Sequence, residues 1–209
     1  MALATIAREA GLGDKRAPMI PADLLLHAYR NAVFPMGSPD GEITWFSPDP
    51  RAIIPLDDGF HVPHGLRRAL KRGAFEIRVD TAFETVMRRC AAREETWIHE
   101  DIIASYVELH RLGHAHSVEA WLGGQLAGGL YGVALGGAFF GESMFQEVTD
   151  ASKVALHALV MRLRARGFSL LDTQWLTPHL ETFGALEIPR SVYRRRLLAC
   201  SDKECRFGE

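Results

Sequence analysis

Three polar side chains interrupt the apolar segments between Gly141 and Gln174, and they are the first candidates for chemistry. Glu142 lies inside one apolar run, and Asp172 and Gln174 close another. A carboxylate in a buried strand is costly unless it has a partner or a ligand. Asp172 and Gln174 are two residues apart, so in a strand they share one face. They could orient an attacking amine and balance its charge, or they could simply pair the end of a strand.

A strand, a helix and a second strand are expected to position these three residues. Apolar residues predict strands at 138–145 and 168–174. The segment between them, 150–166, has the pattern of a helix that ends at Gly167. A helix that links two strands is typical of a crossover between parallel strands.

The segments on either side of this unit predict a mixed α/β (α+β) fold. Before it come predicted strands at 116–122 and 126–134, and the pairs Gly123-Gly124 and Gly136-Gly137 separate the three strands as hairpin turns. An antiparallel meander followed by a crossover helix is the element order of the GNAT-type acyltransferase fold. Further predicted elements are helices at 63–72, 83–90, 102–109, 178–183 and 192–198 and strands at 75–79 and 186–188.

Two domains are predicted, a small N-terminal domain at 1–60 and a GNAT-like catalytic domain at 61–209. The first contains a short helix after Pro21, a turn cluster at 36–42 and an extended segment at 43–56. Prolines in that extended segment should confine it to a sheet edge or a loop. The boundary is expected near Asp57-Asp58-Gly59.

Composition excludes several classes of protein. The chain has 209 residues, of which 47% are hydrophobic, and no apolar run approaches the length of a membrane span. The three cysteines are scattered, which favours a reducing cytoplasm over a disulfide-bonded secreted fold. A net charge of −2 argues against a bulk nucleic-acid coat. Basic segments at 66–73 and 190–197 could still hold one end of a nucleic acid.

Eight short motifs occur along the chain in an order and spacing that resemble the bacterial leucyl/phenylalanyl-tRNA–protein transferases. The resemblance covers roughly residues 22–198. The motifs are WFSPDPR (45–51), EETWI (94–98), LGHAHSVE (112–119), GGLYGVALG (128–136), FGESMF (140–145), DASKVAL (150–156), LLDTQ (170–174) and HLETFGALEIPR (179–190).

The resemblance implies an aminoacyltransferase with a GNAT-like catalytic domain and a small N-terminal domain. The family moves Leu, Phe or Met from aminoacyl-tRNA to the N-terminal amine of proteins that begin with Arg or Lys, which marks them for N-end-rule degradation. The ester of the donor is already activated, and the attacking α-amine has a pKa of about 7.7–8.0. We therefore expect neither a cofactor nor a metal, and we expect a cytoplasmic monomer.

The resemblance also implies roles for particular residues. Asp172 and Gln174 correspond to a proposed proton relay, and Glu142 to a group that holds an amino group or the acceptor cation; a core salt bridge is the alternative for Glu142. Phe46 and Trp97 would stack on the 3′-terminal adenosine of the tRNA, although Phe46 stands where some members have a second Trp. The amino-acid pocket would comprise Leu130, Phe139, Leu156, Leu159, Leu163 and Leu171, and the phosphate contacts Arg67, Arg68, Lys71 and Arg72.

Two other functions fit parts of the sequence. A CoA-dependent GNAT N-acyltransferase would need a pyrophosphate cradle before the central helix, but the loop QEVTDAS lacks glycine and contains Glu147 and Asp150. A non-catalytic adaptor that reads N-terminal Arg or Lys would need the acidic group alone. Such an adaptor would leave the apolar pocket beside Asp172 and Gln174 without a purpose.

Overall fold

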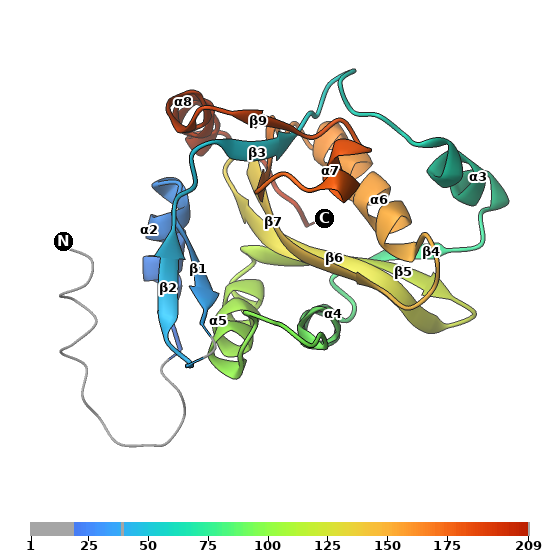
Figure 1. Cartoon of the computed structure of the whole chain (residues 1–209), viewed down its shortest axis with the longest axis horizontal. Helices are drawn as coiled ribbons and strands as arrows, with labels where there is room; N and C mark the ends of the chain where they lie inside the picture. Colours follow the sequence, from blue (N-terminus) through green and yellow to red (C-terminus); the bar gives the residue numbers. More distant parts are fainter. Residues whose placement is uncertain (1–18, 39, 209) are drawn as a thin grey trace.

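The computed structural model describes residues 19–38 and 40–208, so residues 1–18 of the predicted N-terminal domain lie outside the described part. A large mixed sheet forms the centre of the fold (Figure 1). Its strands are β3 (Arg51–Ile54), β4 (Glu76–Val79), β5 (Ala115–Leu122), β6 (Gln125–Leu135), β7 (Ala138–Gln146), β8 (Leu170–Gln174) and β9 (Leu186–Ile188). They are arranged in the order β4-β5-β6-β7-β8-β3-β9.

Helices cover both faces of this sheet, and each face has its own apolar cluster. In Figure 1, α6 lies on one side of the meander and α4 and α5 lie on the other. The helices are α2 (Ala22–Arg30), α3 (His64–Arg72), α4 (Phe83–Ala91), α5 (Glu100–Arg111), α6 (Ala151–Ala165), α7 (Pro178–Glu181) and α8 (Arg190–Ser201). Within the described residues, no helix combines the length and the apolarity that crossing a lipid bilayer requires.

The predicted core of the fold is confirmed. β5, β6 and β7 form an antiparallel meander, and β7 pairs with β8 in parallel through the crossover helix α6. Gly123 and Gly124 both adopt positive φ, which explains why a glycine pair makes the turn between β5 and β6. The mixed α/β class follows directly from this arrangement.

One prediction for the N-terminal segment is wrong. Its prolines were expected to keep 43–56 at an edge or in a loop, but β3 lies inside the large sheet, between β8 and β9. Pro50 and Pro55 flank β3 instead of interrupting it, so the strand keeps all its N–H donors. Residues 34–37 (β1) and 43–46 (β2) pair in a separate two-stranded sheet. The boundary near 57–59 stays a prediction.

Two irregularities in the strand pairing occur next to Glu142 and Asp172. The pairing of β7 with β8 ends at Phe140 opposite Asp172, and beyond that point the parallel strands have no common ladder. On the other side of β7, Tyr131 pairs with Ser143 and Gly132 with Gly141, which leaves Glu142 as the extra residue of a β-bulge. The bulge and the end of the ladder thus fall at the same level of the sheet.

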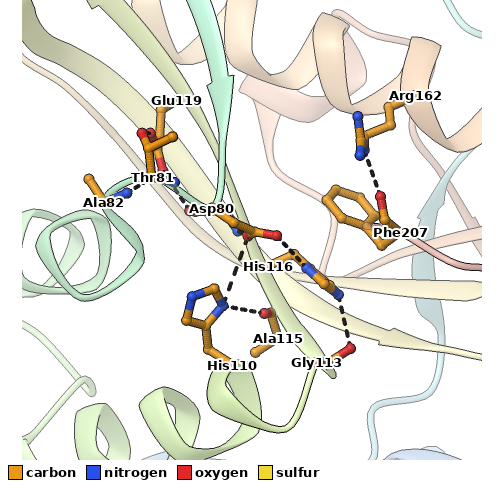
Figure 2. A network of polar contacts seen from close by, with 11 residues as sticks. Asp80, Thr81, Ala82, His110, Gly113, Ala115, His116, Glu119, Arg162 and Phe207 are labelled. Carbon is orange, nitrogen blue, oxygen red and sulfur yellow. Dashed lines mark hydrogen bonds and ion pairs between the residues drawn. The ribbon is translucent and has the colours of Figure 1, made fainter. Parts of the chain in front are cut away.

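A buried polar network fixes the start of α4, which covers the same face of the sheet as α5 (Figure 2). Glu119 is fully buried, and its carboxylate accepts hydrogen bonds from Thr81 N (2.9 Å), Ala82 N (2.8 Å), Ser117 Oγ (2.8 Å) and the Thr81 hydroxyl. These donors include the backbone N–H groups at the beginning of α4, which have no partner within the helix. Glu119 therefore ties α4 to β5.

We expect Glu119→Gln to lower the free energy of unfolding by about 2–3 kcal/mol, because the amide places an NH₂ donor among groups that are themselves donors. Chemical denaturation monitored by circular dichroism measures this loss. Glu76→Gln is the matched control, since Glu76 is exposed and, among the residues that the structure describes, bonds only to Arg78. Equal stability of the two variants would contradict the proposed anchoring.

Candidate active site

A cavity of about 380 Å³ opens where β7 and β8 separate. One wall is apolar and comes from α6, β6, β7 and β8, and the opposite side carries polar groups and an aromatic rim from β1 and nearby loops. The apolar wall comprises Leu130, Met144, Leu156, Leu159 and Leu171. The polar lining comprises Tyr131, Glu142, Ser143, Thr173, Gln174, Arg93, Thr177 and His179, and the rim comprises Phe34, Met36, Trp97 and Trp175.

Glu142 is the only carboxylate among the described residues that line the cavity. Its Oε1 accepts hydrogen bonds from Tyr29 Oη (2.8 Å) and Gln174 Nε2 (3.4 Å), and its Oε2 accepts one from Tyr106 Oη (3.4 Å). Burial raises the pKa of Glu142 to about 8; the bond from Tyr29 opposes this shift, and the nearby Asp172 charge adds to it. Hydroxyl and amide groups thus hold Glu142, and within the described chain no Lys or Arg forms an ion pair with it.

Asp172 lies behind the cavity wall, with no exposed surface. Arg51 binds it through two bonds, Nε to Oδ1 (2.8 Å) and Nη2 to Oδ2 (2.5 Å), and Tyr193 Oη donates a third (2.9 Å). Burial disfavours the charge of Arg51, but the Asp172 carboxylate outweighs this effect and raises the pKa of Arg51. Both oxygens of Asp172 are therefore occupied by a buried cation and a hydroxyl.

Gln174 connects this buried pair to the cavity. Its backbone adopts φ +60°, a left-handed conformation that is uncommon for a residue with a side chain. The Gln174 N–H donates to Asp172 Oδ1 at 3.0 Å, which holds the strained backbone in place. Its side-chain Nε2 then donates to Glu142, so Gln174 Oε1 remains as an acceptor at the cavity.

Sequence comparisons identify the family to which this arrangement belongs. The model of the family described as leucyl/phenylalanyl-tRNA protein transferase matches residues 53–198, and that of its N-terminal domain matches residues 19–49. The chain belongs to the leucyl/phenylalanyl-tRNA protein transferase family. A relative of that name from Herpetosiphon aurantiacus is 58% identical over 181 residues, 85% of this chain and 94% of the relative.

Another leucyl/phenylalanyl-tRNA–protein transferase, from Akkermansia muciniphila, is 58% identical over 190 residues, which span 89% of this chain and 96% of the relative. Among solved structures, a GCN5-related N-acetyltransferase-like protein from Streptococcus suis aligns with a TM-score of 0.37 at 14% identity, over 79% of this chain and 63% of that one. Family membership thus rests on the sequence relatives.

Four of the six residues predicted for the amino-acid pocket line the transferase cavity: Leu130, Leu156, Leu159 and Leu171. The other two, Phe139 and Leu163, are fully buried behind this wall. Phe139 stacks on Phe207 from the C-terminal segment, with ring centroids 5.0 Å apart. These two residues support the pocket from the core.

Of the two aromatic residues predicted to stack on adenosine, Trp97 belongs to the rim and Phe46 packs behind it. Trp97 lines the cavity itself. Phe46 packs on Phe34 (6.1 Å between centroids) and meets Trp175 edge to face (5.9 Å), so it backs two residues of the rim. Trp175 is 41% exposed, lines the cavity and is therefore a third aromatic candidate that sequence reasoning missed.

The four basic residues predicted for phosphate contacts lie on α3, away from the cavity lining. Leu66 and Ala69 bury one side of this helix against the cluster that contains α6. Arg67, Arg68, Lys71 and Arg72 are exposed on its outer side, and none has an ion-pair or hydrogen-bond partner among the described residues. They are free to meet an external anion.

Sequence reasoning also missed the residues that support the site from other parts of the chain. Arg51 ends the motif WFSPDPR, but nothing in its spacing pointed to Asp172, 121 positions later. Tyr29 and Tyr106 lie in amphipathic helices, where the sequence pattern predicts that an aromatic residue packs in the core. For Arg51, the one available signal was an arginine directly before three apolar residues of a predicted extended segment.

Proposed function

We propose that this chain transfers Leu, Phe or Met from aminoacyl-tRNA to the N-terminal α-amine of proteins that begin with Arg or Lys, and that it does so in the cytoplasm as a step of N-end-rule degradation. One observation carries the proposal: a single cavity joins an apolar wall to the carboxylate of Glu142. The wall suits the donor side chain, and the carboxylate suits the cation of the acceptor. The names of the two relatives, both leucyl/phenylalanyl-tRNA–protein transferases, support the reaction class.

The reaction needs orientation more than a strong catalyst, because the ester of the donor is already activated. The amine nitrogen attacks the ester carbonyl carbon, the bond to the 3′ oxygen breaks, and that oxygen leaves with a proton. Gln174 Oε1 is placed to accept a hydrogen bond from the attacking amine. The acceptor α-amine has a pKa of about 7.7–8.0, so part of it is already neutral near pH 7 and no strong base is required.

We assign Asp172 a positioning role. The proton relay implied by the resemblance would require an Asp172 oxygen that is free to take a proton. Arg51, Tyr193 and the Gln174 N–H already occupy both oxygens. Asp172 therefore acts through Gln174, by holding the left-handed backbone that presents its side chain to the cavity.

The apolar wall explains a tolerance for several donors. One methylene in an apolar pocket changes the binding free energy by only about 1–3 kcal/mol. Leu156 and Leu159 lie on adjacent turns of α6 and form the apolar wall together with Leu171. Such a wall excludes polar side chains strongly but separates Leu, Phe and Met weakly.

The decisive experiment is transfer of labelled Phe from Phe-tRNA to four peptides that differ only in their first residue. We expect transfer to the Arg-start and Lys-start peptides and none to the Asp-start or Ala-start peptides, because the cavity presents one carboxylate to the acceptor. Transfer to the Asp-start peptide would overturn the assignment of the acceptor. Absence of any transfer would favour a non-catalytic adaptor.

The structure argues against the CoA-dependent alternative. The turn before α6 contains Glu147 and Asp150, and Asp150 adopts φ 71° at the first residue before the helix. A pyrophosphate bound at this helix terminus would meet negative charge where glycine N–H groups are needed. Isothermal titration should accordingly show no binding of acetyl-CoA under conditions in which a Phe-tRNA analogue binds.

The arginines of α3 provide a separate prediction about tRNA. Each phosphate contact contributes about 0.7–0.9 to the slope of log affinity against log salt concentration. The double variant Arg67→Gln/Arg68→Gln should therefore bind tRNA more weakly and reduce that slope by about 1.4–1.8. Filter binding over a series of KCl concentrations measures both quantities.

Arg194→Gln/Arg195→Gln on α8 is the matched control for charge. Both of these arginines are exposed and, among the described residues, unpaired, like those on α3. In Figure 1, α8 and α3 lie at opposite ends of the molecule. A slope that changes equally in the two double variants would contradict a contact that is particular to α3.

A further inference from the structure

We propose that the hydroxyl of Tyr131 is a specificity contact for the cationic side chain of the acceptor protein. It accepts a hydrogen bond from the guanidinium or ammonium group that Glu142 binds. The inference rests on the proposed function and adds a second, uncharged acceptor to the cation site.

The first observation is a buried hydroxyl that is not used within the protein. Tyr131 on β6 has no exposed surface, yet it lines the cavity. Its Oη has no hydrogen-bond partner among the described residues. Leaving a buried hydroxyl unpaired is unfavourable, and a site that binds a ligand is one place where proteins retain such a group.

The ring of Tyr131 packs against two other aromatic rings, which hold its position. It meets Phe83 edge to face at 6.0 Å and 82°, and Tyr106 at 5.9 Å and 87°. The position is also fixed along the strand, because Tyr131 pairs with Ser143 directly beside the bulge that contains Glu142. The hydroxyl is therefore preorganised on the Glu142 side of the cavity.

Several polar groups around Glu142 are already engaged, while Gln174 Oε1 and the Thr173 hydroxyl, which also line the cavity, keep acceptor capacity. The hydroxyls of Tyr29 and Tyr106 bond to each other and to the Glu142 carboxylate. Arg93 Nη2 donates to Ser143 Oγ (3.0 Å) and to the Met144 carbonyl (2.7 Å). Tyr131 Oη and Thr173 Oγ1 are thus the two buried side-chain atoms of the described residues that line the cavity and lack a hydrogen-bond partner, and Tyr131 is the one that pairs beside the Glu142 bulge.

The direction of the strand separates Tyr131 from the donor pocket. Neighbouring residues in a strand point to opposite faces, so Leu130 and Tyr131 face opposite sides of β6. Leu130 packs in the apolar cluster with α6, and Tyr131 packs in the cluster with α4 and α5. The apolar side chain of the donor belongs to the first side, which leaves the Tyr131 side to the acceptor.

A cation is the ligand class that best satisfies both groups. A guanidinium carries five N–H donors and an ammonium three, and the one carboxylate cannot accept them all. A hydroxyl oxygen beside it can accept another. A neutral apolar side chain would leave Glu142 without a cation and the Tyr131 hydroxyl without a partner, so the pair discriminates against such acceptors.

Tyr131→Phe tests the proposal, because it removes only the hydroxyl. We expect KM for Arg-start and Lys-start peptides to rise about 10-fold, since hydrogen bonds to charged groups are among the stronger ones. KM for Phe-tRNA and kcat should change less than about 2-fold, since the ring stays in place. The melting temperature should not fall, because the lost hydroxyl makes no bond to the described residues.

Equilibrium binding of argininamide and norleucinamide to both proteins provides a second measurement. We expect Tyr131→Phe to weaken argininamide binding by about the same 10-fold and to leave norleucinamide unchanged. An unchanged KM for the peptide, or a lowered melting temperature, would overturn the inference while the wild-type transfer assay still succeeds. If the wild type transfers nothing, it is the proposed function that fails.

Discussion

Replacing Glu142 by Gln is expected to reduce kcat/KM for Arg-start peptides by at least about 100-fold, because a buried cation without its carboxylate partner costs about 2–5 kcal/mol. Glu142 is the one carboxylate among the described residues that line the cavity, so no neighbour replaces it. KM for Phe-tRNA should stay within a few-fold of its original value, since the apolar wall and the rim are unchanged.

The same residue predicts a pH dependence. Burial raises the pKa of Glu142 to about 8, so in the empty site the carboxyl group is mainly neutral below that pH and ionised above it. KM for Arg-start peptides should therefore fall as the pH rises toward 8 and then level off. The acceptor α-amine loses its proton in the same range. Glu142→Gln separates the two effects, because it retains only the titration of the amine.

Stability provides the control for this variant. A carboxyl group with a raised pKa holds a proton in the folded state that the unfolded chain has already lost, so it reduces stability as pH rises from about 4.5 to 8. Glu142→Gln removes that penalty and should melt at an equal or higher temperature at pH 8.5. A variant that is both unstable and inactive would show a structural role for Glu142.

The elements around the site could be predicted because their signals are local. Alternating and continuous apolar runs, separated by glycine pairs, gave the meander and the crossover at nearly the correct residues. The polar exceptions Glu142 and Gln174 marked the cavity for the same reason, since burying them within a strand requires a purpose. The local sequence pattern was therefore sufficient to predict where along the strands the site lies.

The contacts that decide the role of each residue are not local. Asp172 and Arg51 come together only because β3 inserts between β8 and β9, a pairing between distant segments that prolines at 48, 50 and 55 seemed to forbid. The bulge at Glu142 likewise depends on the register of β6 against β7. The resemblance implied a relay at Asp172, and the tertiary contacts of Asp172 favour a positioning role.

Asp172→Ala is expected to destabilise the protein by about 3–5 kcal/mol, because it leaves the Arg51 charge buried without a partner. Arg51 is 1% exposed, and its guanidinium lies between the rings of Phe34 and Tyr193, at 4.7 and 4.8 Å from their centroids. Loss of transfer in this variant would therefore not separate chemistry from folding. Thermal denaturation monitored by circular dichroism measures the expected loss.

Asp172→Asn makes the distinction, and Tyr193→Phe is its matched control. The Asn oxygen can still accept the Gln174 N–H, which Asp172 Oδ1 accepts at 3.0 Å in the native protein, but an amide cannot carry a proton at neutral pH. If Asp172 positions Gln174, the folded fraction of Asp172→Asn should transfer Phe within about 10-fold of the wild-type kcat, with the same pH profile. A proton relay predicts a loss of at least about 100-fold.

Tyr193→Phe removes one bond to Asp172 Oδ2 and keeps the charge pair, so it should cost about 1–2 kcal/mol of stability and leave kcat nearly unchanged. The rates must be compared below the melting temperature of the weakest variant, with the folded fraction measured in the same buffer. A folded Asp172→Asn protein without detectable transfer would support a proton relay through Asp172 and contradict the positioning role. Substantial transfer by that protein would instead support the positioning role. Gln174 would then accept the hydrogen bond of the attacking amine, Glu142 would bind the acceptor cation, and the buried Arg51–Asp172 pair would hold Gln174 in place.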